Sequence, residues 1–206
     1  MLILTSKSFQ RLDDNEKITK LLTEASNGKN VLMISNAATK ETNNFMARVI
    51  VKECFENIGA LKVDVVDIDS YNIACILDYD VIYVCGGDIR PLLNLIEKTD
   101  FKAYIEKFLK NGGTYIGNSS GSVIVGHDTK FLFKLKMGHS KSPEYTAIPE
   151  FTKGLGLVDI NILPHANCFE IDFVKKCKDY ERINGIKFRY LNDDEYILVN
   201  DAIIFE

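Results

Sequence analysis

The stretch "YDVIYVCGGDIRPLLNLIEKTDFKAYIEKFLKNGGTYIG", residues 79–117, shows how this chain is organised. An apolar run at 79–87 ends in two glycines, and a segment with helical spacing then runs from Pro91 to a second pair of glycines. Another apolar run follows at 114–117. Because proline is tolerated in the first turn of a helix and glycine commonly ends one, we predict strand, helix, strand. This unit is typical of a right-handed crossover between parallel strands.

The same alternation continues on both sides of this unit. Further strands are predicted at 2–5, 30–35, 61–68, 157–163, 186–190, 195–199 and 202–205. Further helices are predicted at 13–26, 41–58 and 169–183. We therefore expect an α/β fold, with a mostly parallel sheet between two layers of helices. The polar segment 127–156 is predicted to be a functional or mobile loop, and "VNDA" (199–202) a hairpin turn.

Composition and charge exclude several classes of protein. The chain has 206 residues, 46% of them hydrophobic and 26% charged, which is typical of one globular domain. Its net charge is −4 and its 25 basic residues are scattered, which argues against nucleic-acid binding. The start "MLILTSKSFQ" has too few apolar residues for the core of a signal peptide. No run approaches the ~18 consecutive apolar residues needed to span a bilayer. We expect a cytoplasmic protein without a membrane partner.

The cysteines give no sign of a metal site. Their number is odd, and no two form a Cys-x-x-Cys pair, so neither a disulfide framework nor a zinc site is predicted. They are Cys54, Cys75, Cys85, Cys168 and Cys177. We expect most of them to be small buried residues, and we predict no metal and no organic cofactor.

A Gly-x-Ser-x-Gly pattern lies at residues 117–121, directly after the apolar run at 114–117. In a nucleophile elbow this spacing holds the middle serine in a strained turn between strand and helix, and the glycines let neighbouring backbone pass close by. The helix that follows directs free amides towards the bound group. Ser119 is therefore a candidate nucleophile, and the alternative from the turn alone is a plain loop.

A serine nucleophile needs a base, and the chain has three histidines, His127, His139 and His165. His165 lies in "NILPHAN", directly after an apolar strand, where catalytic residues of α/β sheets gather. We choose it as the base. The segment "LNDDEY" (191–196) offers a third group that would orient the imidazole. We choose Asp193 there, while Asp194 and Glu195 stay open as alternatives.

Three segments together resemble the peptidase E, or alpha-aspartyl dipeptidase, family of serine peptidases: "VIYVCGGDIRPLLNLI", "NGGTYIGNSSGSVIVG" and "GLGLVDINILPHAN". The resemblance runs in order from "LILTS" to "LNDDEYILV". It implies a flavodoxin-like fold similar to class I glutamine amidotransferases, in a single peptidase E-like domain over 1–206. It also implies a catalytic Ser119, His165 and Asp193, and an oxyanion hole made by the amides of Gly87 and Ser120.

This sequence departs from the family pattern at three places. Ser120 replaces the usual alanine, and Asp88 stands where asparagine is usual, beside a site that must stabilise negative charge. Arg90 could neutralise Asp88, or the carboxylate could point away. The arginine that holds an acidic substrate side chain is missing, because the first one after the histidine is Arg182. Three lysines in this region could replace it, but a lysine lacks the bidentate fork of an arginine; they are Lys175, Lys176 and Lys178. We therefore do not predict a preference for an N-terminal aspartate.

We therefore predict a serine peptidase that hydrolyses short peptides through an acyl-enzyme, as a monomer or homodimer. The segment 127–150 would cover the site and exclude long chains. The alternative is an inactive domain of this fold that binds a small molecule or a protein partner. Two other activities are disfavoured: a phosphate site at "GGDIR" lacks a glycine-rich signature, and amidotransferases carry cysteine in place of Ser119.

Overall fold

The computed structural model describes residues 1–9, 16–38, 45–137, 151–200 and 203–205. Some predictions fall partly outside these ranges. They are the first residues of the helices predicted at 13–26 and 41–58, part of the loop at 127–156, part of the hairpin turn at 199–202, and the first residue of the strand predicted at 202–205.

The centre of the molecule is a seven-stranded sheet with the order β3-β2-β4-β5-β1-β8-β9. Its strands are β1 (Leu2–Thr5), β2 (Asn30–Ile34), β3 (Lys62–Val66), β4 (Val81–Val84), β5 (Thr114–Asn118), β8 (Tyr196–Val199) and β9 (Ile203–Phe205). The pairs β3-β2, β2-β4, β4-β5 and β5-β1 are parallel, whereas β1-β8 and β8-β9 are antiparallel. The prediction of a mostly parallel sheet is confirmed.

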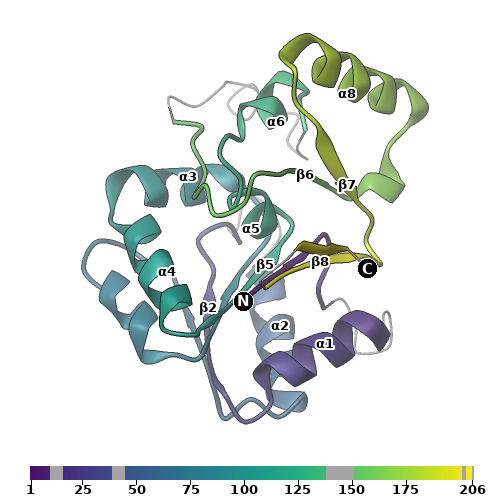
Figure 1. Ribbon diagram of the computed structural model, residues 1–206. Helices are drawn as coiled ribbons and strands as arrows, with labels where there is room; N and C mark the ends of the chain where they lie inside the picture. The colour runs from purple at the N-terminus through teal and green to yellow at the C-terminus, as the bar shows by residue number, and fades with distance from the viewer. Residues whose placement is uncertain (10–15, 39–44, 138–150, 201–202, 206) are drawn as a thin grey trace.

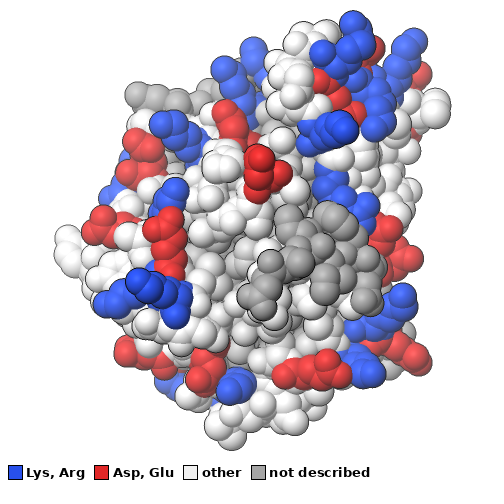
Figure 2. Space-filling view, in the orientation of Figure 1, with Lys and Arg blue, Asp and Glu red and all other residues white. Residues whose placement is uncertain are grey.

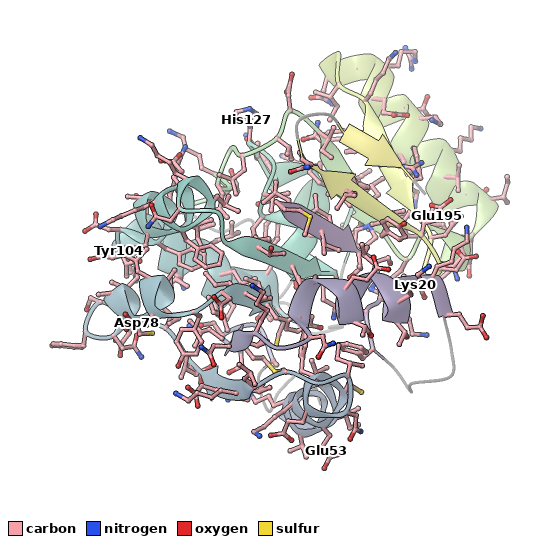
Figure 3. All side chains as sticks on the ribbon, turned by 60° about the horizontal axis from the view of Figure 1, so that its bottom comes forward. Lys20, Glu53, Asp78, Tyr104, His127 and Glu195 are labelled. Carbon is pink, nitrogen blue, oxygen red and sulfur yellow. The ribbon has the colours of Figure 1, made fainter. Side chains whose placement is uncertain are left out.

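Helices cover both faces of this sheet (Figure 1). One layer contains α1 (Glu16–Ser26) and α2 (Phe45–Asn57); the other contains α3 (Ile89–Lys98), α4 (Phe101–Lys110) and α5 (Ser120–Val123). In Figure 3, Lys20 and Glu53 mark the α1 and α2 side and Tyr104 marks α4. Alternate strand residues enter the two cores: Met33 packs in the core with α1 and α2, and Ile34 in the core with α3 and α4. This alternation confirms the three-layer architecture.

The helix predicted from Pro91 to 110 is two helices, because Thr99 interrupts it. The Thr99 hydroxyl donates to the carbonyl of Leu95 (2.6 Å) and accepts from the amide of Phe101 (3.2 Å), so it ends α3 and starts α4. Its backbone is extended, with φ −139° and ψ 173°. A threonine that bonds its own neighbours competes with helical hydrogen bonds, and the break lets Phe101 become fully buried.

A second, smaller sheet lies beside the main one (Figure 1). It pairs β6 (Asn161–Pro164) in parallel with β7 (Phe188–Leu191), and the chain between them forms η2 (Ala166–Cys168) and α8 (Ile171–Asn184). The strand predicted at 157–163 corresponds to β6, which is shorter. The strand predicted at 186–190 corresponds to β7, which pairs with β6 in the small sheet and not with the main sheet. Because the α8 crossover returns the chain parallel to β6, the carboxyl ends of β6 and β7 meet at one edge.

Among the described residues, three short helices lie in segments that we did not predict to be helical. They are η1 (Ile73–Asp78), η2 (Ala166–Cys168) and α6 (Lys130–Lys134), the last of which lies inside the predicted loop at 127–156. Helix α6 forms because its three central side chains are buried in the core; they are Phe131, Leu132 and Phe133.

The surface in view carries charges of both signs. In Figure 2, Lys and Arg lie among Asp and Glu rather than forming one basic face. In the described part of the chain, no helix combines the length and the apolar character that crossing a bilayer requires.

Candidate active site

Ser119 lies at a sharp turn between β5 and α5. Its backbone has φ 51° and ψ −113°, a conformation that favours glycine. A Cβ atom on Gly117 would lie 2.7 Å from the carbonyl oxygen of Gly121, and one on Gly121 would lie 2.3 Å from that of Val84. The two glycines of the pattern are therefore required, since α5 packs directly against the ends of β4 and β5.

The turn is held by buried hydrogen bonds from the first strand. The Ser119 amide donates to the Thr5 carbonyl (2.9 Å), and the Thr5 hydroxyl donates to the Gly117 carbonyl (3.0 Å). The Ser122 hydroxyl lies 3.0 Å from the Thr5 amide nitrogen and 2.8 Å from its carbonyl oxygen. A strained residue persists only where its surroundings fix it, and these contacts fix Ser119.

The close approach of Gly121 gives a first prediction. We expect Gly121→Ala to lower the free energy of unfolding by about 2–3 kcal/mol, because the new methyl group would overlap backbone that cannot rotate away. Gly28→Ala is the control, since nothing lies within 4 Å of its added Cβ; it should cost about 1 kcal/mol for the left-handed backbone alone. Denaturant unfolding measures both. Equal losses would contradict the packing argument.

Three predicted site residues are brought together at this turn. The Ser119 Oγ lies 3.0 Å from His165 Nε2, and His165 Nδ1 lies 2.6 Å from Asp193 Oδ1. His165 directly follows β6 and Asp193 follows β7 by two residues, and the register pairs Pro164 with Leu191. The small parallel sheet therefore delivers the imidazole and the carboxylate to the same edge, facing the serine.

The Asp193 carboxylate is held ionised by its neighbours. Burial raises its pKa, but hydrogen bonds from Ser6 and His165 and the electrostatic attraction of His165 and Lys7 outweigh burial, so the pKa lies below its usual value. The Asp193 amide also donates to the Asn167 side chain (3.1 Å), which anchors the carboxylate-bearing turn to η2. An ionised carboxylate at Nδ1 is the group that fixes the tautomer of a catalytic imidazole.

The lowered pKa of Asp193 gives a second prediction. A carboxylate with a lower pKa in the folded than in the unfolded state stabilises the fold above the unfolded pKa, and this contribution disappears as the pH falls through the folded value. We expect the Tm difference between wild type and Asp193→Asn to be constant down to about pH 5 and to shrink below about pH 4. Thermal scans across this range measure it. A difference that stays constant to about pH 3 would contradict the prediction.

The other candidate acids and bases lie elsewhere. Glu195 accepts from the Asn192 amide (3.0 Å) and pairs with Arg189 (3.7 Å), so it closes the turn between β7 and β8. His127 is exposed, and Figure 3 shows it well apart from Glu195. His139 is outside the described residues. Of the three adjacent acids, Asp193 is the one whose carboxylate contacts His165.

The amides proposed for an oxyanion hole belong to Ser120, which follows the serine, and to Gly87 in the glycine turn after β4. Ser120 is the first residue of α5, and its hydroxyl donates to the Gly87 carbonyl (2.9 Å), which joins the glycine turn to the helix. Gly87 has φ 136°, a value that favours glycine. Among the described residues, neither amide donates a hydrogen bond to another protein group. Both N–H groups are therefore available to a bound oxyanion.

Asp88 is neutralised rather than left facing this site. Its carboxylate caps α3 by accepting from the Arg90 amide (3.0 Å), and it also accepts from the Arg90 guanidinium at Nε (3.0 Å) and Nη2 (2.7 Å). The capping role explains why an acidic residue suits this position. The charge that the sequence places beside the predicted oxyanion hole is thus compensated within α3, by Arg90.

One polar residue at the site was missed by the sequence analysis. Ser6 directly follows β1, is fully buried, and contacts both His165 and Asp193. Its position in "LILTS", at the carboxyl end of a strand, is the signal that could have found it, since site residues gather at such ends.

Cysteine chemistry does not fit the site. Cys85 follows β4 but is buried, and burial raises its pKa to about 12, so it carries no thiolate near neutral pH. Cys168 is exposed in η2, outside the turn that holds Ser119. Within the described ranges, no cluster of three or more His, Cys, Asp or Glu side chains could hold a metal ion.

Comparison with known protein families matches residues 1–204 to the family model of peptidase family S51. The chain belongs to peptidase family S51. It is therefore a peptidase, of the serine class, and the predicted resemblance is confirmed. The family match covers the described sheet, the small sheet and the segments that carry the serine, histidine and aspartate.

Relatives and solved structures agree with this membership. The chain is 30% identical over 179 residues to an uncharacterized peptidase of Listeria innocua, covering 84% of this chain and 82% of that protein. It is 26% identical over 178 residues to an uncharacterized peptidase of Pasteurella multocida, with the same two coverages of 84% and 82%.

A crystal structure of a candidate peptidase E from Listeria monocytogenes matches with a TM-score of 0.76 and 27% identity, covering 100% of this chain and 96% of that one. A peptidase from an acI-B1 Actinobacterium matches with a TM-score of 0.67, over 100% of this chain and 87% of that one. At 16% identity the second match shows the fold alone. The predicted flavodoxin-like α/β fold is confirmed.

Proposed function

We propose that the peptidase uses Ser119 as nucleophile, His165 as base and Asp193 as the orienting acid. The observation that carries this proposal is the continuous chain of contacts from Ser119 Oγ to His165 Nε2 (3.0 Å) and from His165 Nδ1 to Asp193 Oδ1 (2.6 Å). Both distances are within hydrogen-bonding range, as a nucleophile and its base require.

In the proposed mechanism, Ser119 Oγ attacks the scissile carbonyl carbon while His165 Nε2 accepts the hydroxyl proton. Asp193 accepts from Nδ1–H and stabilises the imidazolium that forms. The Gly87 and Ser120 amides donate to the oxyanion, and one such donor contributes roughly 10²–10³ in rate in known enzymes. The imidazolium then protonates the departing amine, which leaves an ester on Ser119. Water, deprotonated by His165, hydrolyses this ester and releases the second product.

We propose short peptides, dipeptides in particular, as substrates. The similarity to a candidate peptidase E supports this class. No preference for an N-terminal aspartate is proposed. Of the positive side chains on α8, Lys178 is paired with Glu181 (3.0 Å) and Arg182 with Asp179 (3.4 Å). The charge of each is therefore already matched by a carboxylate of α8 rather than left for an acidic substrate side chain. The single-domain organisation, the cytoplasmic location and the choice between monomer and homodimer stay predictions, as does the role of segment 127–150, part of which is outside the described residues.

Covalent labelling tests the nucleophile directly. A fluorophosphonate should modify Ser119, and peptide mapping by mass spectrometry would locate the adduct. In parallel, a dipeptide library assayed with wild type and Ser119→Ala should give turnover for the wild type alone. An adduct on another residue instead of Ser119 would contradict the proposed nucleophile. Equal negligible turnover by both proteins would favour the inactive binding domain instead.

A further inference from the structure

Ser6 occupies the junction between the two sheets. The nucleophile Ser119 belongs to the main sheet, whereas His165 and Asp193 follow the two strands of the small sheet. Ser6 directly follows β1 of the main sheet, and its side chain is fully buried. Its hydroxyl reaches both residues of the small sheet, 159 and 187 positions away along the chain.

The hydroxyl of Ser6 makes a defined set of contacts. It donates to Asp193 Oδ1 (2.7 Å) and accepts from the His165 backbone amide (2.6 Å). It also lies 3.2 Å from His165 Nδ1. Since its own proton goes to the carboxylate, the Nδ1 proton of His165 remains available to the same carboxylate oxygen, 2.6 Å away. This arrangement leaves Nε2 unprotonated and directed at Ser119.

The backbone of His165 explains why such a tie is needed. His165 has φ 60° and ψ 33°, a left-handed conformation that is strained for a residue with a side chain. Strained residues at functional sites persist when their surroundings fix them. The hydrogen bond from the His165 amide to Ser6 helps to hold this conformation. Because Ser6 follows β1, the bond fixes the position of the imidazole against the main sheet, although His165 itself follows β6 of the small sheet.

We infer that Ser6 is a positioning residue for the peptidase reaction. It ties the base and the acid of the small sheet to the sheet that carries the nucleophile, and it sets the hydrogen bond between His165 and Asp193. This inference rests on the proposed function of Ser119, His165 and Asp193. Ser6 acts through these residues and is not proposed to touch the substrate.

The test compares Ser6→Ala with wild type. We expect kcat/KM to fall roughly 10- to 100-fold, as the loss of a hydrogen bond to a charged group predicts. The loss should be in kcat with KM nearly unchanged, because the contact orients the base rather than binding substrate. A far-downfield proton resonance from His165 Nδ1–H, present in wild type, should shift or broaden in the variant.

Ser35→Ala is the matched control. Ser35 is also a fully buried serine that directly follows a parallel strand, β2, and its hydroxyl lies 3.1 Å from the Val66 carbonyl and 2.8 Å from Asp67 Oδ1. It has no contact with the three proposed catalytic residues. The control should lose a comparable amount of stability while keeping both kcat and the downfield resonance.

A double-mutant comparison shows whether Ser6 acts through Asp193. If it does, Ser6→Ala should add little to the loss caused by Asp193→Ala, because interacting residues are not additive. Full additivity would overturn the inference, and so would wild-type kcat together with an unchanged resonance in Ser6→Ala. If Ser6→Ala does not fold, Ser6→Cys replaces the hydroxyl with a weak donor of similar shape, and the same outcomes decide.

The two proposals fail in different ways. If Ser119 is not labelled and wild type hydrolyses no dipeptide, the proposed function fails, but the downfield resonance still reports whether Ser6 sets the His165–Asp193 contact. If Ser119 is labelled and Ser6→Ala turns over like wild type with its resonance intact, the positioning role fails and the proposed function stands.

Discussion

Ser119→Ala is expected to lower kcat/KM for the proposed dipeptide hydrolysis by about 10⁴- to 10⁶-fold. The reason is that His165 Nε2, 3.0 Å from the missing hydroxyl, would have no nucleophile to deprotonate. The oxyanion amides and the substrate contacts would remain, so the residual rate is that of water attack on a bound peptide. Steady-state kinetics on the best dipeptide from the library measures the loss, and the fluorophosphonate adduct should disappear with it.

Ser35→Ala serves again as the control for Ser119→Ala. It removes a buried serine hydroxyl from the end of another parallel strand. It should keep kcat/KM within a few-fold of wild type, because a substitution at a site that does not contact the catalytic residues couples only weakly to them. If Ser119→Ala kept more than about a hundredth of wild-type activity, well above the residual rate expected without the nucleophile, another residue would have to form the acyl-enzyme. The mechanism proposed above would then be wrong.

Asp193→Asn is expected to lower kcat by about 10⁴-fold while leaving the fold intact. An asparagine at this position can present its NH₂ group to His165 Nδ1, which would then accept, and Nε2 would carry the proton. Nε2 could no longer take the proton of Ser119. The shape of the side chain is nearly unchanged, so the loss is one of tautomer and charge rather than packing. Pre-steady-state acylation with an activated ester measures the step directly.

Asp194→Asn is the matched control, because it makes the same chemical change one residue away. The structure places the carboxylate of Asp193 2.6 Å from His165 Nδ1. The control should therefore keep kcat within a few-fold of wild type. A large loss in Asp194→Asn with little loss in Asp193→Asn would reassign the third residue, which the sequence alone left open among three adjacent acids.

The parallel sheet could be predicted because its signals are local. Each strand is a short apolar run bounded by glycine or polar residues, and the Gly-x-Ser-x-Gly pattern after β5 marks the turn by its own spacing. The glycines at 117 and 121 are required because a Cβ atom at either position would lie 2.7 Å or 2.3 Å, respectively, from a backbone oxygen, so their identity carries the geometry of the turn. His165 was found as a residue that directly follows a strand, which is where α/β sheets place functional groups. Asp193 was chosen from three adjacent acids between two predicted strands.

Features that depend on distant contacts could not be predicted. The break at Thr99 has a different, local cause: the Thr99 hydroxyl bonds Leu95 and Phe101, whereas the helical spacing of the sequence continues across it. The short helix α6 is stabilised by burial of its phenylalanines, which becomes visible only when the core is assembled. The pairing of β6 with β7 is a tertiary contact that no local pattern encodes. The same is true of the contacts of Ser6 with His165 and Asp193, which are 159 and 187 positions further along the chain.

The division of the site between two sheets has a consequence during synthesis of the protein. On the proposed triad, a ribosome-bound nascent chain that has already folded around Ser119 would hold a serine without a base or an orienting acid. Hydrolysis could begin only after the segment through β7 and Asp193 has emerged and docked. Contacts of such long sequence separation form slowly, so the order of translation itself would delay the onset of proteolysis until most of the polypeptide is in place.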